Sequence, residues 1–154
     1  MFFSTFEKQL DAKRRIVAPL DFRAAVAPLD GVFCFPSIEA NCIEGGGQAL
    51  FDSYLALIGE FPLGDPLRTA LETSVLGGMS RLGFDTAGRI TLPDTLCQQF
   101  GLEDWVVVVG LGERFQIWPR EAFYANRERL RLEARDGLAA HRAQQRSGRS
   151  GAAA

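Results

Sequence analysis

Histidine is nearly absent from this chain of 154 residues, and cysteine is scarce. The single histidine, His141, lies near the C-terminal end, which argues against a catalytic triad or a metal site centred on histidine. The three cysteines, Cys34, Cys42 and Cys97, are odd in number and form no CxxC pair. They predict reduced thiols in a cytoplasmic protein rather than a disulfide framework. We therefore expect no enzyme and no cofactor.

Long apolar runs and an excess of basic charge are also missing. No stretch reaches the roughly eighteen apolar residues of a transmembrane helix, and the first residues do not have the pattern of a signal peptide. The formal net charge is −2, but it is unevenly distributed. Residues 1–29 contain five Lys/Arg and three Asp/Glu, and residues 120–154 contain eight Lys/Arg and four Asp/Glu. Residues 30–119, in contrast, contain four Lys/Arg and twelve Asp/Glu. A nucleic-acid site would therefore use the two ends of the chain.

One short stretch occurs twice, 74 residues apart. Residues 11–19 read DAKRRIVAP and residues 85–93 read DTAGRITLP, so that Asp, Arg, Ile and Pro fall at the same offsets. The same spacing aligns the apolar residues 32–35 with residues 106–109, and Ile43 with Ile117. A register held over such a length indicates an internal duplication of one supersecondary unit.

Each copy of the motif predicts a tight turn followed by a short strand. The aspartate can accept hydrogen bonds from backbone N–H groups two or three residues later, and Gly88 can take a positive φ. Proline then ends the strand, because it has no N–H to donate. Along the chain, alternation and helical spacing predict strands at residues 5–10, 15–17, 32–36, 40–44, 81–84, 90–92, 106–110 and 115–118, and helices at 20–26, 48–58, 65–76, 94–100 and 119–140. Residues 45–47 predict a break, and the residues after Gln144 predict a disordered tail.

The spacing of these motifs resembles that of the MraZ family of bacterial regulators. The resemblance rests on the two Asp-x-x-x-Arg-Ile-x-x-Pro copies about half a chain apart, the start near Met1, and the sequence Gln116-Ile117-Trp118 after the second copy. It covers roughly residues 1 to 140. It implies an α+β fold of two tandem AbrB-like swapped-hairpin units, which form one β-barrel core around a pseudo-two-fold axis with peripheral helices.

The resemblance also implies a domain plan and an assembly. Repeat 1 would span residues 5–52 and repeat 2 residues 79–124. Linking helices would occupy residues 53–78. A C-terminal helix and a disordered tail would occupy residues 125–154. Chains of this family assemble into closed rings, so a homo-oligomer is expected.

The function that the resemblance implies is transcriptional regulation. Such a protein binds double-stranded promoter DNA at direct repeats upstream of its own division and cell wall gene cluster, usually as a repressor. It would work in the cytoplasm, at the nucleoid, without a cofactor and away from membranes.

Lys8, Lys13, Arg14 and Arg15 are the candidate DNA-binding residues. Cations that project from a turn suit phosphate groups, and arginine can also read the O6 and N7 atoms of guanine. The residues alone favour a solvated turn in which Arg15 pairs with Asp11, because basic turns are common. The resemblance assigns the DNA contact to this turn and to Arg15. Arg14 stands where the family has glycine. A side chain at a positive φ costs about 1 kcal/mol, so we expect this turn to be reshaped.

The second copy predicts a structural turn. Asp85, Gly88 and Arg89 repeat the motif without the extra cations, and we expect Arg89 to bond to Asp85 or to lie at a subunit interface. Farther on, arginines 127, 131 and 135 fall on one helix face. That face is a solvated surface, a secondary contact with the DNA backbone, or an interface with a neighbouring subunit.

A protein-interaction module is the rival function. AbrB-like folds also serve as antitoxins whose tails wrap a toxin, and here the arginine-rich C-terminal tail would have that role.

Overall fold

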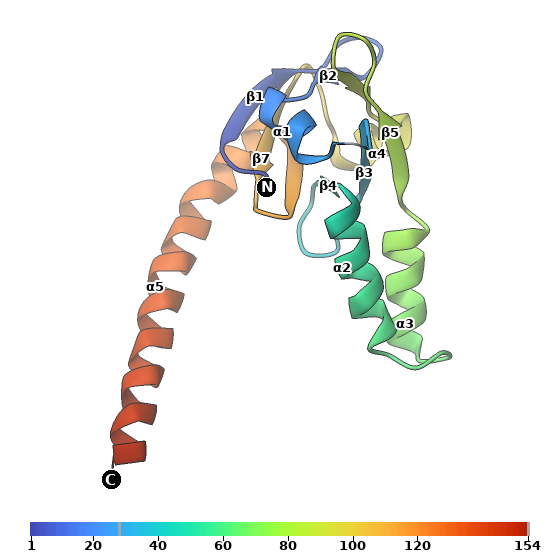
Figure 1. Cartoon of the computed structure of the whole chain (residues 1–154). Coiled ribbons are helices and arrows are strands. Elements are labelled where there is room, and N and C mark those ends of the chain that lie inside the picture. The colour runs from blue at the N-terminus through green and yellow to red at the C-terminus, as the bar shows by residue number, and fades with distance from the viewer. Residues whose placement is uncertain (28, 154) are drawn as a thin grey trace. The chain divides into compact units, whose positions relative to one another are not determined.

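The computed structural model describes residues 1–27 and 29–153, and it has an α+β fold of antiparallel strands and helices (Figure 1). The predicted fold class is confirmed at this level. Two compact units, Met1–Arg120 and Glu121–Ala154, are described separately below. In chain order the elements are β1 (Thr5–Gln9), β2 (Arg15–Val17), α1 (Leu20–Ala25), β3 (Gly31–Pro36), β4 (Ile43–Gly46), α2 (Gln48–Gly59), α3 (Pro66–Leu71), the π-helical turn η1 (Glu72–Leu76), β5 (Ser80–Gly83), β6 (Arg89–Thr91), α4 (Asp94–Phe100), β7 (Trp105–Gly110), β8 (Arg114–Pro119) and α5 (Arg120–Ala153).

Six strands form one open sheet in the order β1-β7-β8-β4-β3-β5, and β2 pairs with β6 in a separate two-stranded ladder. The predicted closed barrel is therefore wrong for the described residues. Closure would require β1 to pair with β5 at the two edges. Instead, the turn that follows each edge strand carries the chain into β2 or β6, and those two strands pair with each other.

Strand pairing connects the two halves of the chain at the 74-residue offset seen in the sequence. Ile16 pairs with Ile90 in the ladder, and Ile43 pairs with Ile117 at the centre of the large sheet. The first strand of each half also joins the hairpin of the other half, because β1 pairs with β7 and β5 pairs with β3. Neither half therefore builds its sheet from its own strands alone.

The large sheet is apolar on both faces. In β3, Val32 and Cys34 belong to the main core, and Phe35 packs on the opposite side against α2 and η1. The main core also receives Ile16 and Ile90 from the ladder and Phe22 from α1. The ladder therefore packs on the sheet with one face and leaves its other face outward.

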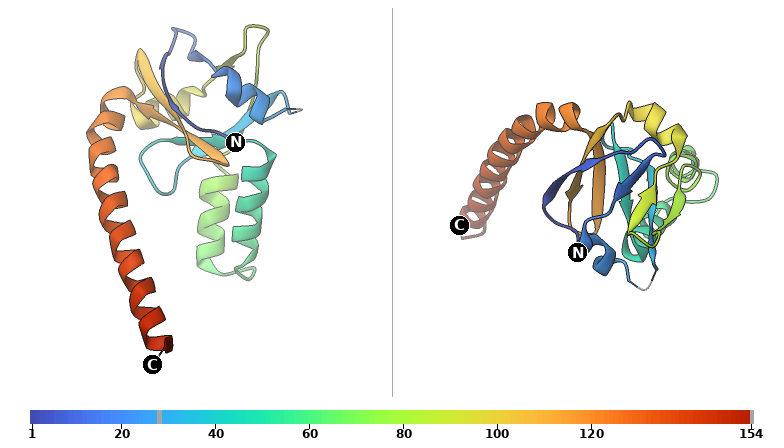
Figure 2. Two further views of the ribbon diagram at one scale, coloured as in Figure 1. Left: turned by 60° about the vertical axis from the view of Figure 1, so that its left-hand side comes forward. Right: turned by 90° about the horizontal axis from the view of Figure 1, so that it is seen from above.

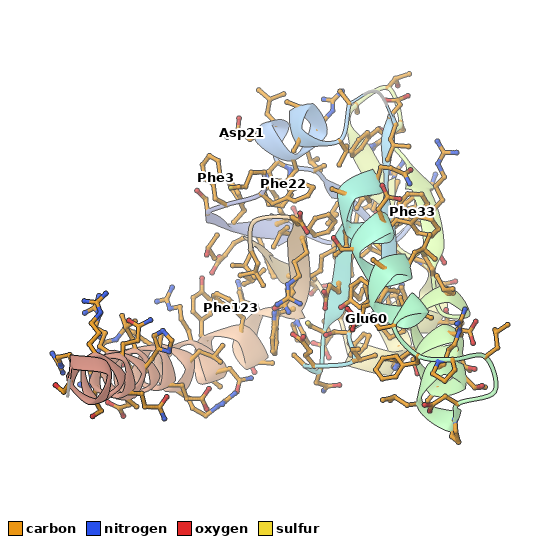
Figure 3. All side chains as sticks on the ribbon, turned by 60° about the horizontal axis from the view of Figure 1, so that its bottom comes forward. Phe3, Asp21, Phe22, Phe33, Glu60 and Phe123 are labelled. Atoms are coloured by element: carbon orange, nitrogen blue, oxygen red, sulfur yellow. The ribbon has the colours of Figure 1, made fainter. Side chains whose placement is uncertain are left out.

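Side-chain direction in α1 follows from its amphipathic sequence. Figure 3 shows the ring of Phe22 directed towards the strands, whereas Asp21 points away from them. Phe22 is 3% exposed and makes an edge contact with Phe2, with ring centroids 4.9 Å apart. This packing fixes α1 next to the chain that leaves β2.

The helix signals in the sequence are largely confirmed. Asp65 caps α3, because its Oδ1 accepts a hydrogen bond from the Leu67 backbone N at 2.8 Å, and Pro66 follows at the first helical position. Gly101 ends α4 with φ of 62°, as expected of a glycine C-cap. The helices α2 and α3 run side by side in Figure 1 and in the left view of Figure 2.

The predicted break at residues 45–47 is wrong, because Gly45 and Gly46 belong to β4. A Cβ atom on Gly45 would lie 2.5 Å from the ring of Phe115, and one on Gly46 would lie 2.8 Å from Leu50. These glycines make room for an aromatic ring and for α2. A local turn signal does not reveal that requirement, because both neighbours are brought in by tertiary folding.

The predicted disordered tail is also wrong. α5 continues to Ala153, and its residues from Arg127 to Gly151 are all exposed. Alanine, arginine and glutamine have high intrinsic helix propensity, so local preference accounts for a helix that buries little. None of the helices in the described residues combines the length and the apolar run of a membrane span.

Glycine 45 supplies a stability test. Gly45→Ala should lower the free energy of unfolding by about 1–3 kcal/mol, because the new methyl group meets the Phe115 ring and the Phe33 carbonyl oxygen. Gly59→Ala is the matched control: its Cβ meets no atom within 4 Å, so it should be neutral or stabilising by up to about 1 kcal/mol. Urea unfolding measures both, and equal effects would contradict this account of Gly45.

Candidate nucleic-acid interface

The first turn, residues 11–15, is organised by the carboxylate of Asp11. Its Oδ1 accepts hydrogen bonds from the backbone N atoms of Lys13 and Arg15, at 2.9 and 2.8 Å. Its Oδ2 accepts a hydrogen bond from Nε of Arg15 at 2.8 Å. One carboxylate thus closes the turn and orients the arginine that begins β2.

The second turn, residues 85–89, has the same arrangement. Oδ1 of Asp85 accepts from the backbone N atoms of Ala87 and Arg89 at 2.9 and 2.8 Å, and Oδ2 accepts from Nε of Arg89 at 2.7 Å. The expected bond between Arg89 and Asp85 is confirmed. Because Arg15 is held in the same way, pairing with aspartate does not by itself separate a structural arginine from a DNA-binding one.

Positive φ angles occur at equivalent positions of the two turns. Arg14 has φ of 63° and Gly88 has φ of 76°. The backbone N of each residue donates to the carbonyl of the turn aspartate, at 3.0 Å in the first turn and 2.9 Å in the second. The expected reshaping of the first turn is therefore wrong: Arg14 adopts the strained conformation, and the hydrogen bonds around Asp11 stabilise it.

The two turns present their arginines on one face of the β2–β6 ladder. Ile16 and Ile90 pair with each other and are buried, so the residues on either side of them point outward. This outward side, the ladder face, consists of Arg15, Val17, Arg89 and Thr91. Arg15 lies opposite Thr91 and Arg89 opposite Val17, so the two arginines are diagonal neighbours with backbones roughly 7–8 Å apart.

The other two predicted cations lie in different surroundings. Lys13 is exposed at the tip of the first turn. Lys8 lies in β1 rather than in the turn, and its Nζ stands 5.8 Å from the centroid of the Phe6 ring. The structure thus brings Lys13, Arg14 and Arg15 together, and it places Lys8 on the strand that leads to them.

Acidic residues surround the first turn. Nε of Arg14 lies 3.6 Å from Oδ1 of Asp94 in α4. Asp11, Glu103 and Asp104 line an open hollow next to the same turn. The positive charge that the sequence concentrates here is therefore partly balanced by carboxylates.

Arg23 was missed by the sequence analysis. Its guanidinium lies against Gly88, where a Cβ atom would come within 2.5 Å of a terminal nitrogen, and 5.7 Å from the centroid of the Phe84 ring. The second turn thus gains a cation from α1 of the first half. The 74-residue alignment could have drawn attention to Arg23, because its counterpart in the second half is Cys97, so this cation is present in one copy only.

A buried polar cluster is the other group that the sequence analysis missed. Glu44 of β4 is fully buried, and its carboxylate accepts hydrogen bonds from Arg114 at 2.9 Å, Tyr54 at 3.1 Å and Ser37 at 3.0 Å. Burial is the main cause that raises the pKa of Tyr54 and of the neighbouring Cys42 to about 12. Neither group is an activated nucleophile, so the cluster is structural. Among the described residues, no three of His, Cys, Asp and Glu gather as metal ligands.

The two turn aspartates are stabilised as carboxylates. The backbone hydrogen bond from Arg15 is the main cause that lowers the pKa of Asp11 below its ordinary value of 3.8, and the one from Arg89 does the same for Asp85. Because the folded-state pKa is lowered, this stabilisation is present above 3.8 and is lost as the pH falls through the folded-state pKa.

A pH series tests this linkage. Asp85→Asn should lower the urea midpoint at pH about 6 and have a smaller effect at pH about 3, where protonation already weakens the wild-type contacts. Asp21→Asn, which alters an exposed carboxylate of α1, is the control for loss of one negative charge. An Asp85→Asn effect of the same size at both pH values would contradict the linkage.

Comparison with known proteins gives one consistent result. A family model described as "MraZ protein, putative antitoxin-like" matches residues 75–146. The protein named "Transcriptional regulator MraZ" in Phenylobacterium zucineum is 71% identical over 97% of this chain and 94% of its own length. The protein of that name in Caulobacter vibrioides is 72% identical over 96% and 95%, and the one in Hyphomonas neptunium is 35% identical over 85% and 80%. The chain contains both turns, and it is similar to these proteins along nearly its whole length. It therefore belongs to the MraZ family.

Proposed function

We propose that this chain is a sequence-specific DNA-binding transcriptional regulator. It represses its own division and cell wall gene cluster by binding direct repeats upstream of it. The observation that carries the proposal is the ladder face, where aspartates hold two arginines in place on an outward surface. The relatives support it, because they are named transcriptional regulators and not enzymes.

The chemistry of the ladder face suits the major groove of DNA. The groove admits a two-stranded ribbon, and arginine donates to guanine O6 and N7. Asp11 engages Nε of Arg15, and within residues 1–27 and 29–153 no acceptor bonds the two terminal nitrogens of this guanidinium, so they can face a base edge. Lys13 and Arg14 lie beside it for phosphate contacts, and Lys8 extends the basic surface along β1.

Arg15 rather than Arg89 reads the DNA in this proposal. Both are held in the same way, so the difference lies in their neighbours. The first turn carries Lys13 and Arg14, whereas Ala87 and Gly88 stand at those positions of the second turn. Arg89 then has a structural role, and Arg23 lies beside it as a further cation.

The proposed architecture is that of two AbrB-like swapped-hairpin units, residues 5–52 and 79–124. Residues 53–78 link them, and residues 125–154 follow. The pairing of Ile16 with Ile90 and of Ile43 with Ile117 supports a pseudo-two-fold relation between the units. We further propose that chains assemble into a ring in the cytoplasm, at the nucleoid.

A ring explains how a small contact achieves specificity. One turn per subunit contributes a small contact area, so a single repeat binds weakly. Tandem repeats matched to tandem subunits raise the effective concentration of each further contact, and the apparent affinity rises without any new contact.

A protein-interaction module is the second candidate. The family description includes the term antitoxin-like, and such a protein would engage its partner through the arginine-rich C-terminal segment. Deleting the residues after Ala140 separates the two readings, because loss of a protein partner with the preference for intact repeats retained favours the module.

DNA retention tests the proposed function directly. The purified full-length chain should retain its own upstream region with the repeats intact, and should bind weakly to a single repeat or to scrambled repeats. Binding should weaken steeply between about 50 and 200 mM salt, because phosphate contacts release counterions. A gel shift at two salt concentrations measures this, and equal retention of intact and scrambled DNA would refute the proposal.

Two matched substitutions test the assignment of Arg15. Arg15→Ala should abolish the preference for intact repeats and leave the oligomer folded. Arg89→Ala removes the Arg89–Asp85 pair, which is equivalent to the Arg15–Asp11 pair, and should keep that preference. Gel shifts give the specificity, and size-exclusion chromatography gives the assembly. Wild-type binding by Arg15→Ala would refute the assignment.

A further inference from the structure

The arginines of α5 gather on one face of the helix. At about 100° per residue, six of the seven arginines that follow Arg120 fall within roughly 100° of the circumference, although they span about two thirds of the length of α5. The six are Arg127, Arg131, Arg135, Arg142, Arg146 and Arg149. The face extends as far as Arg149 because the segment predicted to be disordered is helical. We call these six residues the arginine face.

Charge along the arginine face is balanced at its start and unbalanced at its end. Arg131 pairs with Glu128 at 3.1 Å, and Arg135 pairs with Asp136 at 3.1 Å. After Asp136 the sequence contains no acidic residue, so the last three arginines have no acid on their own segment. The distal half of α5 is therefore purely cationic.

Apolar residues do not form a second face. Of the exposed leucines, Leu130 and Leu138 lie eight residues and about 80° apart, and Leu132 lies more than about 100° from both, so the leucines form no continuous stripe. A helix that lies on a membrane surface or in a coiled coil needs a continuous apolar stripe. The helix is therefore suited to a polyanion rather than to an apolar partner.

We propose that the arginine face binds the phosphate backbone of DNA next to the repeats that the turns read. This inference rests on the proposed function. From Arg127 to Arg149 the helix rises about 33 Å, close to the length of one turn of B-DNA. Arginine binds phosphate in a bidentate manner, and backbone contacts carry no sequence information. α5 thus adds affinity for any duplex and leaves the choice of sequence to the ladder face.

Salt dependence is the signature of such contacts. In the variant Arg142→Gln/Arg146→Gln/Arg149→Gln, the slope of log affinity against log salt should decrease by about 2 to 3, because each lost phosphate contact removes about 0.9. Binding to intact and to scrambled repeats should weaken by the same factor, so the specificity ratio should not change. The corresponding Lys variant keeps the charge and should retain most of the slope.

A matched pair of single substitutions tests the face itself. Arg131 and Arg129 are similarly exposed, at 65% and 58% of the side chain, and each pairs with a glutamate of α5. They differ in direction, because Arg129 lies on the other side of the helix. Arg131→Gln should lower the salt slope by about 1, and Arg129→Gln should leave it unchanged. Equal effects would mean that net charge alone is measured, and would overturn the proposal.

The outcomes separate this inference from the function on which it rests. If the wild-type chain does not prefer intact repeats, the proposed function fails. If it prefers them and the triple Gln variant keeps the wild-type slope, the arginine face does not contact DNA, and an acidic protein becomes its partner. Circular dichroism of each variant verifies that the α5 helix is retained, so that a lost helix is not mistaken for a lost contact.

Discussion

Strand pairing between the two halves is the constraint on which the rest of the structure depends. The ladder forms when β2 meets β6, and the large sheet is continuous because β4 meets β8. Antiparallel pairing of equivalent strands places Arg15 and Arg89 on one side and the two buried isoleucines on the other. The candidate interface is thus a product of both halves and does not exist in either half alone.

The two turns have the same internal hydrogen bonds but different charged residues around them. The aspartate frame is the same in both, down to the atoms that accept each hydrogen bond. What differs is the surroundings: Asp94 lies beside Arg14, and Arg23 lies against Gly88. The charge around each turn therefore depends on the residues of the turn and also on a charged residue from the other half of the chain.

Local chemistry made much of the fold predictable from the sequence. The duplicated motif predicted the turns, the short strands that leave them and the positive φ of Gly88, because these depend on neighbours within a few residues. The open sheet, the strand position of Gly45 and the place of Arg23 depend on contacts between distant segments. Gly45, for example, is explained by the ring of Phe115, seventy residues later. The end of the C-terminal helix, after Gln144, was missed for the opposite reason, since its low burial suggested disorder although its local propensity is high.

The cluster around Glu44 makes the two halves non-interchangeable. At the 74-residue offset, the counterpart of Glu44 is Trp118 and the counterpart of Arg114 is Ala40. If the first halves of two chains paired with each other, two buried carboxylates would meet without a guanidinium, and an unpaired buried charge is strongly destabilising. The buried Glu44–Arg114 ion pair therefore favours pairing between the two unlike halves of this chain over pairing between two copies of the first half.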